Sequence, residues 1–147
     1  MSERELESFL RDFGKAWVER DVEKMLSFFA EDGVFVSRDG TFKGKEELRR
    51  FWTWDVKVNP NVKYRDAGVG IVVKGNKIFH ELIVEGVTPD GRKFEIPGMD
   101  VYEISDGKIQ QKRSFYDGLS IAKQCAKGWL EKTIINAVVN RMEKGLH

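Results

Sequence analysis

The sequence predicts an α+β fold in which helices come first and an antiparallel sheet follows. Apolar residues recur with helical spacing in most of the first 52 residues, whereas runs of strand-forming residues separated by short turns fill residues 62–117. Helices and strands do not alternate along the chain, which argues against repeated βαβ units and a parallel sheet. A length of 147 residues is enough for a packed core.

Three helices and one short strand are expected before the sheet. Ser2 and Glu5 have capping-box spacing, so the first helix is expected over residues 2–20. Asp21 is placed to cap a second helix, which the Asp32-Gly33 pair ends. The remaining elements of this part are a strand at residues 34–36, a turn at 38–40 and a third helix from residue 44 to about residue 52.

Four long strands joined by short turns are expected next. Their ranges are 62–74, 77–87, 93–104 and 108–117. The turns between them contain Gly75-Asn76, the segment 89–91 and Asp106-Gly107, which are typical hairpin sequences. Short connections favour an antiparallel meander.

A long amphipathic helix is expected at the C-terminal end, over residues 119–144, with Gly128 as an interruption that kinks it. We therefore divide the chain into a domain of residues 1–118 and a helical extension of residues 119–147, and we expect this extension to pack on the same domain. Two alternatives are that its apolar stripe covers a cavity or pairs with a second subunit. We also expect the protein to form a homodimer.

The composition excludes several function classes. The net charge is +1, with 25 basic and 24 acidic residues, so the basic excess of a nucleic-acid-binding protein is missing. One cysteine and two histidines do not provide a thiolate cluster or a histidine-rich metal site. The charged start of the chain lacks the apolar region of a signal peptide, and no apolar run has the length of a membrane span. We expect a cytoplasmic protein with no cofactor, no metal and no membrane or nucleic-acid partner.

Strand alternation predicts which side chains share the inner face of the sheet. An unusual number of them are polar or ionisable, namely Tyr64, Asp66, His80, Asp100, Tyr102, Arg113 and Asp117. A β-bulge would reverse any of these assignments locally. Buried polar groups need partners, so this set is either an internal hydrogen-bond network or the lining of a pocket.

Several local motifs carry a resemblance to a known family. They are the segments 28–36 (FFAEDGVFV) and 40–44, then Asp90-Gly91-Arg92, the segment 98–102 (GMDVY), the segment 106–109 (DGKI) and Tyr116-Asp117. Over roughly residues 5–118 the chain resembles the SnoaL-like polyketide cyclase group of the nuclear transport factor two-like (NTF2-like) fold. This resemblance implies a cone-shaped α+β barrel, with a curved antiparallel sheet wrapped by the three N-terminal helices around a pocket.

The resemblance also implies roles for two carboxylates. Asp100 matches the acid that donates to the oxyanion in ketosteroid isomerases, and Asp117 matches the acid or base that ends the last strand in polyketide cyclases and epoxide hydrolases. The isomerase's general-base aspartate and oxyanion tyrosine fall near Ser37 and Phe13 here, so steroid isomerisation by that mechanism is not expected.

The leading hypothesis is a cofactor-independent acid/base enzyme that acts on a small hydrophobic carbonyl compound. One aspartate would donate to the carbonyl and the other would take an α-proton, giving isomerisation, aldol-type cyclisation or dehydration. The expected catalytic residues are Asp100, Asp117 and His80. The expected substrate-binding residues are Trp17, Trp52, Tyr64, Tyr102, Arg113 and Phe115. The alternatives are a non-catalytic binding module for a small hydrophobic ligand and a dimerisation domain whose pocket is filled by its own side chains.

Overall fold

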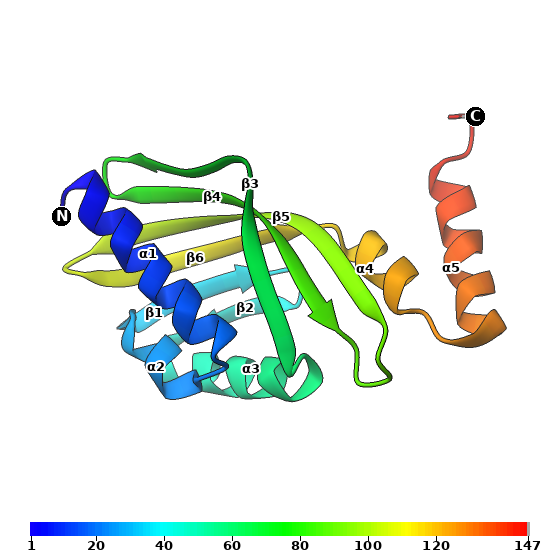
Figure 1. The fold of residues 1–147 in the computed structure, drawn as a ribbon, viewed down its shortest axis with the longest axis horizontal. Coiled ribbons are helices and arrows are strands. Elements are labelled where there is room, and N and C mark those ends of the chain that lie inside the picture. Colours follow the sequence, from blue (N-terminus) through cyan, green and yellow to red (C-terminus); the bar gives the residue numbers. More distant parts are fainter. Residues whose placement is uncertain (147) are drawn as a thin grey trace.

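Helices and strands follow one another along the chain in the α+β order predicted (Figure 1). The structure is a computed structural model that describes residues 1–146. Its elements are α1 (Glu3–Val18), α2 (Val22–Ser27), β1 (Phe29–Ser37), β2 (Gly40–Lys43), α3 (Gly44–Val58), β3 (Asn61–Lys74), β4 (Lys77–Val87), β5 (Lys93–Ser105), β6 (Lys108–Tyr116), α4 (Gly118–Cys125) and α5 (Gly128–Met142).

Both predicted N-caps are confirmed. Ser2 and Glu5 form a reciprocal capping box at the start of α1, and the Asp21 carboxylate accepts from the backbone N–H of Lys24 at the start of α2. Helix α2 is shorter than expected, because Phe29 already pairs with Ile109 of β6 and so begins β1. The chain then turns back as β2, which pairs antiparallel with β1 and was not among the expected strands.

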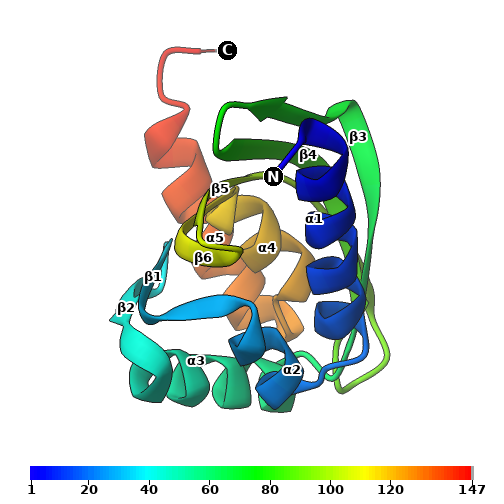
Figure 2. The same ribbon diagram turned by 90° about the vertical axis from the view of Figure 1, so that its left-hand side faces the viewer.

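The six strands form one curved, mixed sheet in the order β2-β1-β6-β5-β4-β3. Strands β3 to β6 are the predicted antiparallel meander, while β1 runs parallel to β6. Helices α1, α2 and α3 lie on the concave side of the sheet, as the two perpendicular views show (Figures 1 and 2). The apolar core lies between these helices and the sheet and is rich in aromatic rings, including Phe13, Phe29, Phe35 and Trp52.

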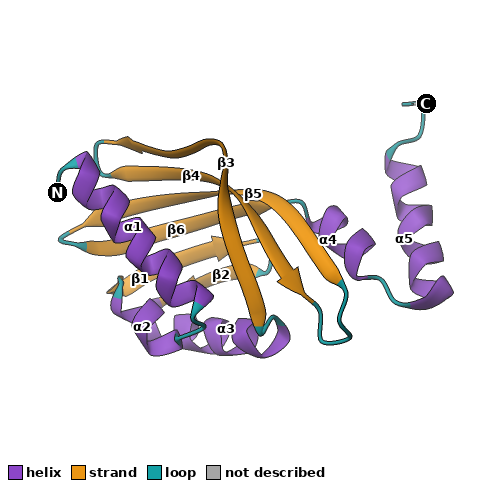
Figure 3. Cartoon of the chain, in the orientation of Figure 1, coloured by secondary structure: helices purple, strands orange, loops and turns teal. Residues whose placement is uncertain are grey.

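The C-terminal segment is two helices rather than one (Figure 3). Gly128 has a φ of +63°, in the left-handed region, and there the chain changes direction. Helix α4 is attached to the sheet, since the Gln124 side chain exchanges hydrogen bonds with the backbone of Glu95.

Helix α5 points away from the body of the protein (Figure 1). Several apolar side chains along it are exposed, with Trp129 at 78%; the others are Leu130, Ile134, Val138 and Met142. The expectation that the extension packs on the same domain along its whole length is therefore wrong for α5. The turn at Gly128 directs that helix outward instead of along the sheet. No helix within residues 1–146 is long and apolar enough to cross a membrane.

The predicted inner faces are confirmed for β4 and β5 and are wrong for most of β6. The side chains of His80, Leu82 and Asp100 are buried, as strand alternation requires. In β6, Ile109 is opposite Ile104, but Gln111 is opposite Glu103, so one extra residue, Gln110, lies in β6. This bulge moves every following side chain of β6 to the opposite face.

Candidate functional site

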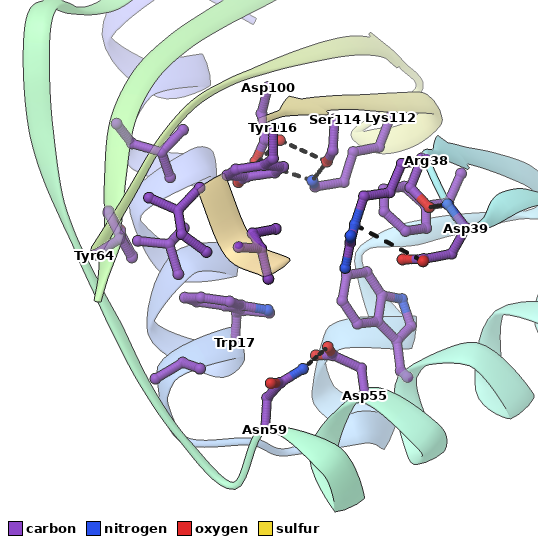
Figure 4. A pocket seen from close by; sticks show the side chains of 18 of the residues that line it. Trp17, Arg38, Asp39, Asp55, Asn59, Tyr64, Asp100, Lys112, Ser114 and Tyr116 are labelled. Atoms are coloured by element: carbon purple, nitrogen blue, oxygen red, sulfur yellow. Dashed lines mark hydrogen bonds and ion pairs between the residues drawn. The ribbon is translucent and has the colours of Figure 1, made fainter. Parts of the chain in front are cut away.

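A pocket of about 210 Å³ lies between the concave face of the sheet and helices α1 and α3. Helix α4 contributes Ile121 and Cys125 to its lining. Most lining side chains are apolar or aromatic, and four of the polar ones, Asp100, Lys112, Ser114 and Tyr116, lie together (Figure 4). Pockets of this kind, apolar with a few convergent polar groups, are typical of small-molecule sites.

Six of the nine predicted site residues line this pocket: Trp17, Trp52, Tyr64, His80, Asp100 and Tyr102. They come from α1, α3, β3, β4 and β5, elements whose inward faces follow from simple periodicity.

The other three predicted residues, Arg113, Phe115 and Asp117, do not line the pocket. Phe115 is 57% exposed, and Arg113 faces Glu103 at 3.6 Å on the outer side of the sheet. Asp117 follows the end of β6 and caps α4, where its carboxylate accepts from the backbone N–H groups of Leu119 and Ser120. Of the predicted pair of pocket aspartates, only Asp100 therefore lines the pocket. The cause is the bulge at Gln110, which reverses the face of β6.

In place of those three residues, β6 presents Lys112, Ser114 and Tyr116 to the pocket. Sequence reasoning missed them because a bulge is not visible in alternation. The only local sign of the bulge is the pair Gln110-Gln111, which follows the buried Ile109. In a regular strand, position 111 would face inward again, and glutamine is an unusual residue for such a position.

Asp100 is the centre of a buried polar cluster at one end of the pocket (Figure 4). Its Oδ2 lies 2.9 Å from the Lys112 ammonium and accepts from the Tyr102 hydroxyl at 3.0 Å. Its Oδ1 accepts from Ser114 at 2.6 Å and, at 3.4 Å, from Tyr116. Both carboxylate oxygens are thus occupied by protein donors. These contacts differ from the expected role, in which Asp100 itself donates to the substrate.

Lys112 is the buried cation of the cluster. Its ammonium donates to Ser114 and pairs with Asp100, and it lies 4.8 Å from the ring centroid of Phe35 and 5.2 Å from that of Tyr102. An ammonium has three donors, so one remains beyond the two that Ser114 and Asp100 receive. Burial lowers the pKa of Lys112, while the charge of Asp100 opposes this shift. Such a group is suited to give a proton or a hydrogen bond to a bound ligand.

The two tyrosines of the cluster remain donors. Burial, with the nearby charge of Asp100, raises the pKa values of Tyr102 and Tyr116 well above the ordinary tyrosine value. Both hydroxyls therefore keep their protons at physiological pH and continue to donate to the carboxylate.

A series of polar contacts through His80, Asp66 and Arg11 connects the pocket with the surface. The Nε2 atom of His80 lies 2.9 Å from Oδ1 of Asp66, and the Arg11 guanidinium binds both carboxylate oxygens of Asp66 at 2.8 and 2.5 Å. The hydrogen bond from Arg11 holds the pKa of Asp66 at about 2. The His80 side chain is 4% exposed, whereas that of Asp66 is 37% exposed.

Further charged side chains line the pocket outside this cluster (Figure 4). Arg38 and Asp39 lie on one side of it, with the Arg38 Nε 3.8 Å from the Asp39 carboxylate. Asp55 of α3 pairs with Arg20 at 2.6 Å and accepts from the Asn59 amide at 3.0 Å. The buried indole N–H of Trp52, which also lines the pocket, has no hydrogen-bond partner. Within residues 1–146, no three His, Cys, Asp or Glu side chains converge in a way that could hold a metal ion.

Solved structures with this fold are numerous, and three illustrate their range. A protein of ketosteroid isomerase-like fold from Catenulispora acidiphila, in complex with trimethylamine, is 19% identical, has a TM-score of 0.71, and aligns over 79% of this chain and 90% of its own. TerC, co-crystallised with polyporic acid, is 15% identical with a TM-score of 0.71, over 80% and 95% of the two chains. SalBIII, an epoxide hydrolase/cyclase-like enzyme, is 18% identical with a TM-score of 0.69, over 81% and 95%.

These identities are low, so the three structures establish the fold and not the reaction. No curated protein matches the sequence significantly. A family model does match, the SnoaL-like domain, over residues 10–112. This range contains all elements from most of α1 to the middle of β6, and with it most of the pocket. The chain is a member of the SnoaL-like domain family, with the NTF2-like, ketosteroid isomerase-like fold.

Proposed function

We propose that the protein is a cofactor-independent acid/base enzyme that acts on a small hydrophobic carbonyl compound. The observation that carries this proposal is the buried Asp100–Lys112 pair in the wall of an otherwise apolar pocket. A buried, charge-paired group of this kind in a cleft is more common at active sites than elsewhere. Isomerisation, aldol-type cyclisation and dehydration all require what this cluster offers, a donor to a carbonyl oxygen.

In this proposal, the group that binds the carbonyl oxygen comes from β6. The carbonyl oxygen of the substrate accepts from the Lys112 ammonium, and negative charge that develops there as an α-proton leaves is stabilised by this buried cation. Asp100 holds Lys112 in place and keeps the cluster electrically neutral before the substrate binds. Trp17, Trp52 and Tyr64 surround the apolar body of the substrate.

Two solved structures with this fold support a small-molecule ligand. The Catenulispora protein was crystallised with trimethylamine and TerC with polyporic acid, both small organic molecules. SalBIII is described as epoxide hydrolase/cyclase-like, in pyran ring formation. We extend only the small-molecule class, and not the individual ligands, to this chain.

A deuterium-exchange experiment tests the proposal. The protein is incubated in D₂O with a panel of cyclic and aryl ketones, and ¹H NMR measures the loss of α-hydrogens. We expect exchange above the protein-free rate for at least one ketone, and its loss in Asp100→Asn, because Lys112 is then misplaced. Asp117→Asn is the matched control and retains the rate, since asparagine is also a good N-cap and position 117 lies outside the pocket.

A binding module without catalysis is the second candidate, because every oxygen of Asp100 already has a protein donor. A satisfied network of this kind also serves a rigid binding wall. This candidate predicts that no ketone exchanges above background, while a fluorescent apolar probe such as 1-anilinonaphthalene-8-sulfonate binds wild type and Asp100→Asn equally. That combination of results would overturn the enzymatic proposal.

A further inference from the structure

We propose that His80 is the general base of the pocket, that it acts through its Nδ1 atom, and that Asp66 and Arg11 are the positioning residues that fix its tautomer. This inference rests on the proposed function and assigns the group that takes the proton. It is carried by the contacts along the chain Arg11–Asp66–His80.

The tautomer of His80 follows from what Asp66 is able to do. The Asp66 carboxylate is bound at both oxygens by Arg11 and is ionised at any physiological pH, with a pKa of about 2. An ionised carboxylate only accepts hydrogen bonds. The Nε2 atom of His80, 2.9 Å away, must therefore carry a hydrogen. In the neutral imidazole this leaves the lone pair on Nδ1. No described protein group forms a hydrogen bond with Nδ1.

His80 is a better base than Asp100. The two oxygens of Asp100 accept from four donors, so a proton taken by either oxygen must displace one of these contacts. His80 gains a proton at a free lone pair, and the imidazolium that forms is stabilised by the anionic Asp66, as in other aspartate–histidine pairs. In the sheet register His80 lies directly opposite Asp100, so base and electrophilic cluster are neighbours on one face.

The charged and titratable groups around His80 are few. Asp66 and Tyr64 face it from β3, with the Tyr64 ring 5.5 Å away in an edge-on arrangement. Asp100 faces it from β5, and Arg11 of α1 reaches it only through Asp66. The imidazole of His80 thus has an anionic carboxylate, that of Asp66, as its neighbour on the Nε2 side.

The proton step is balanced within this site. The α-C–H bond of the ketone breaks, its proton forms a bond with Nδ1, and its electron pair moves toward the carbonyl oxygen, giving an enolate bound by Lys112. For isomerisation the Nδ1–H then returns the same proton to another carbon of the conjugated system. The substrate class is therefore a ketone with an acidic α-hydrogen, and no oxidant or further reactant is needed.

The tautomer is measured by ¹⁵N-edited NMR of the imidazole nitrogens, and this needs no substrate. The chain has two histidines, so His147→Gln leaves His80 as the single signal set. We expect the neutral imidazole to be in the Nε2–H form. Asp66→Asn should move it toward Nδ1–H, because the asparagine amide is able to donate to Nε2. Asp12→Asn, which removes one exposed carboxylate of α1, is the charge-matched control and should leave the tautomer unchanged.

The same variants are then measured in the ketone exchange experiment. His80→Gln should lower the exchange rate by about 100-fold or more, the usual contribution of a general base. Asp66→Asn should lower the kcat of exchange by the same factor as the fraction of Nε2–H tautomer, and KM should not change. Asp66→Glu should have a higher exchange rate than Asp66→Asn. A loss of packing alone would not move the tautomer.

The outcomes separate this inference from the proposed function. An Nδ1–H or mixed tautomer in the wild type, or no change in Asp66→Asn, overturns the role of Asp66 whatever the activity. Full exchange in His80→Gln overturns the role of His80 as base. Absence of exchange with every ketone in the wild type overturns the proposed function, and the base assignment with it, even where the tautomer is as expected.

Discussion

Asp100 and Asp66 are both charge-paired carboxylates on the pocket side of the sheet, but water reaches only one of them. The side chain of Asp100 is 6% exposed and that of its partner Lys112 is 5% exposed. For Asp66 and Arg11 the values are 37% and 43%. Water screens the exposed pair and does not screen the buried pair. The two ion pairs therefore contribute differently to the free energy of unfolding.

The difference in exposure implies different roles for the two ion pairs. Removing either partner of the buried pair lowers the stability of the fold, since the remaining charge would lack solvation. The outer pair contributes little to stability, and in our proposal it fixes the tautomer of His80. The following changes separate these two roles by their effect on the free energy of unfolding.

The largest effect is expected for Lys112→Met. It leaves the buried Asp100 carboxylate without its cation, and loss of one partner of a buried pair typically costs about 3–5 kcal/mol of unfolding free energy. Urea unfolding measures the loss. Lys74→Met, at an exposed lysine at the end of β3, is the matched control and should change stability by less than ~0.5 kcal/mol. A loss of under ~1 kcal/mol in Lys112→Met would mean that the pair is solvated.

The sequence predicted the part of the site that comes from regular elements. Helical spacing placed Trp17 and Trp52 in the pocket, and strict alternation placed His80 and Asp100 on the inner faces of β4 and β5. These positions follow from local geometry, because periods of 3.6 and 2 residues fix which side chains share a face. The same arguments gave the antiparallel meander of β3 to β6.

The part that failed depends on contacts between distant segments. One extra residue, Gln110, is tolerated in β6 because Ile109 and Gln111 each find a partner in β5. Because of this bulge, Lys112 faces the pocket. Asp117 lies instead at the start of α4, where its carboxylate accepts from backbone N–H groups. The burial of Lys112 was also unexpected, because a lysine is rarely placed inside a protein without a carboxylate partner, which here is supplied by another strand.

A smaller effect is expected for Ser114→Ala in the same cluster. The Ser114 hydroxyl accepts from Lys112 and donates to Asp100, so its removal leaves two buried polar groups each short of one partner. Such a loss costs about 1–3 kcal/mol. Differential scanning fluorimetry gives the change in Tm, with the exposed Ser105→Ala as the control. Equal Tm values for wild type and Ser114→Ala would show that water replaces the hydroxyl, which would make this end of the pocket wet rather than sealed.

The smallest effect is expected at the outer pair, and it depends on pH. The pKa of Asp66 is lowered to about 2 in the folded protein, from an ordinary value of 3.8, mainly by the hydrogen bond from Arg11. A lowered folded-state pKa gives stability that is complete above about pH 4 and is lost as the pH falls toward 2. Because both side chains are more than a third exposed, we expect only ~1 kcal/mol from the pair.

Arg11→Gln should therefore be ~1 kcal/mol less stable than wild type at pH 6 and about equally stable at pH 2, since Asp66 is then half protonated or more in both proteins. Urea unfolding at the two pH values measures the difference, and Arg4→Gln, at an exposed arginine of α1, should show none at either. A difference that stays constant between pH 6 and pH 2 would mean that Arg11 stabilises the fold by packing and not through the charge of Asp66. The His80 tautomer would then depend on some other contact. The Arg11–Asp66 pair would have no functional role that distinguishes it from the buried Asp100–Lys112 pair.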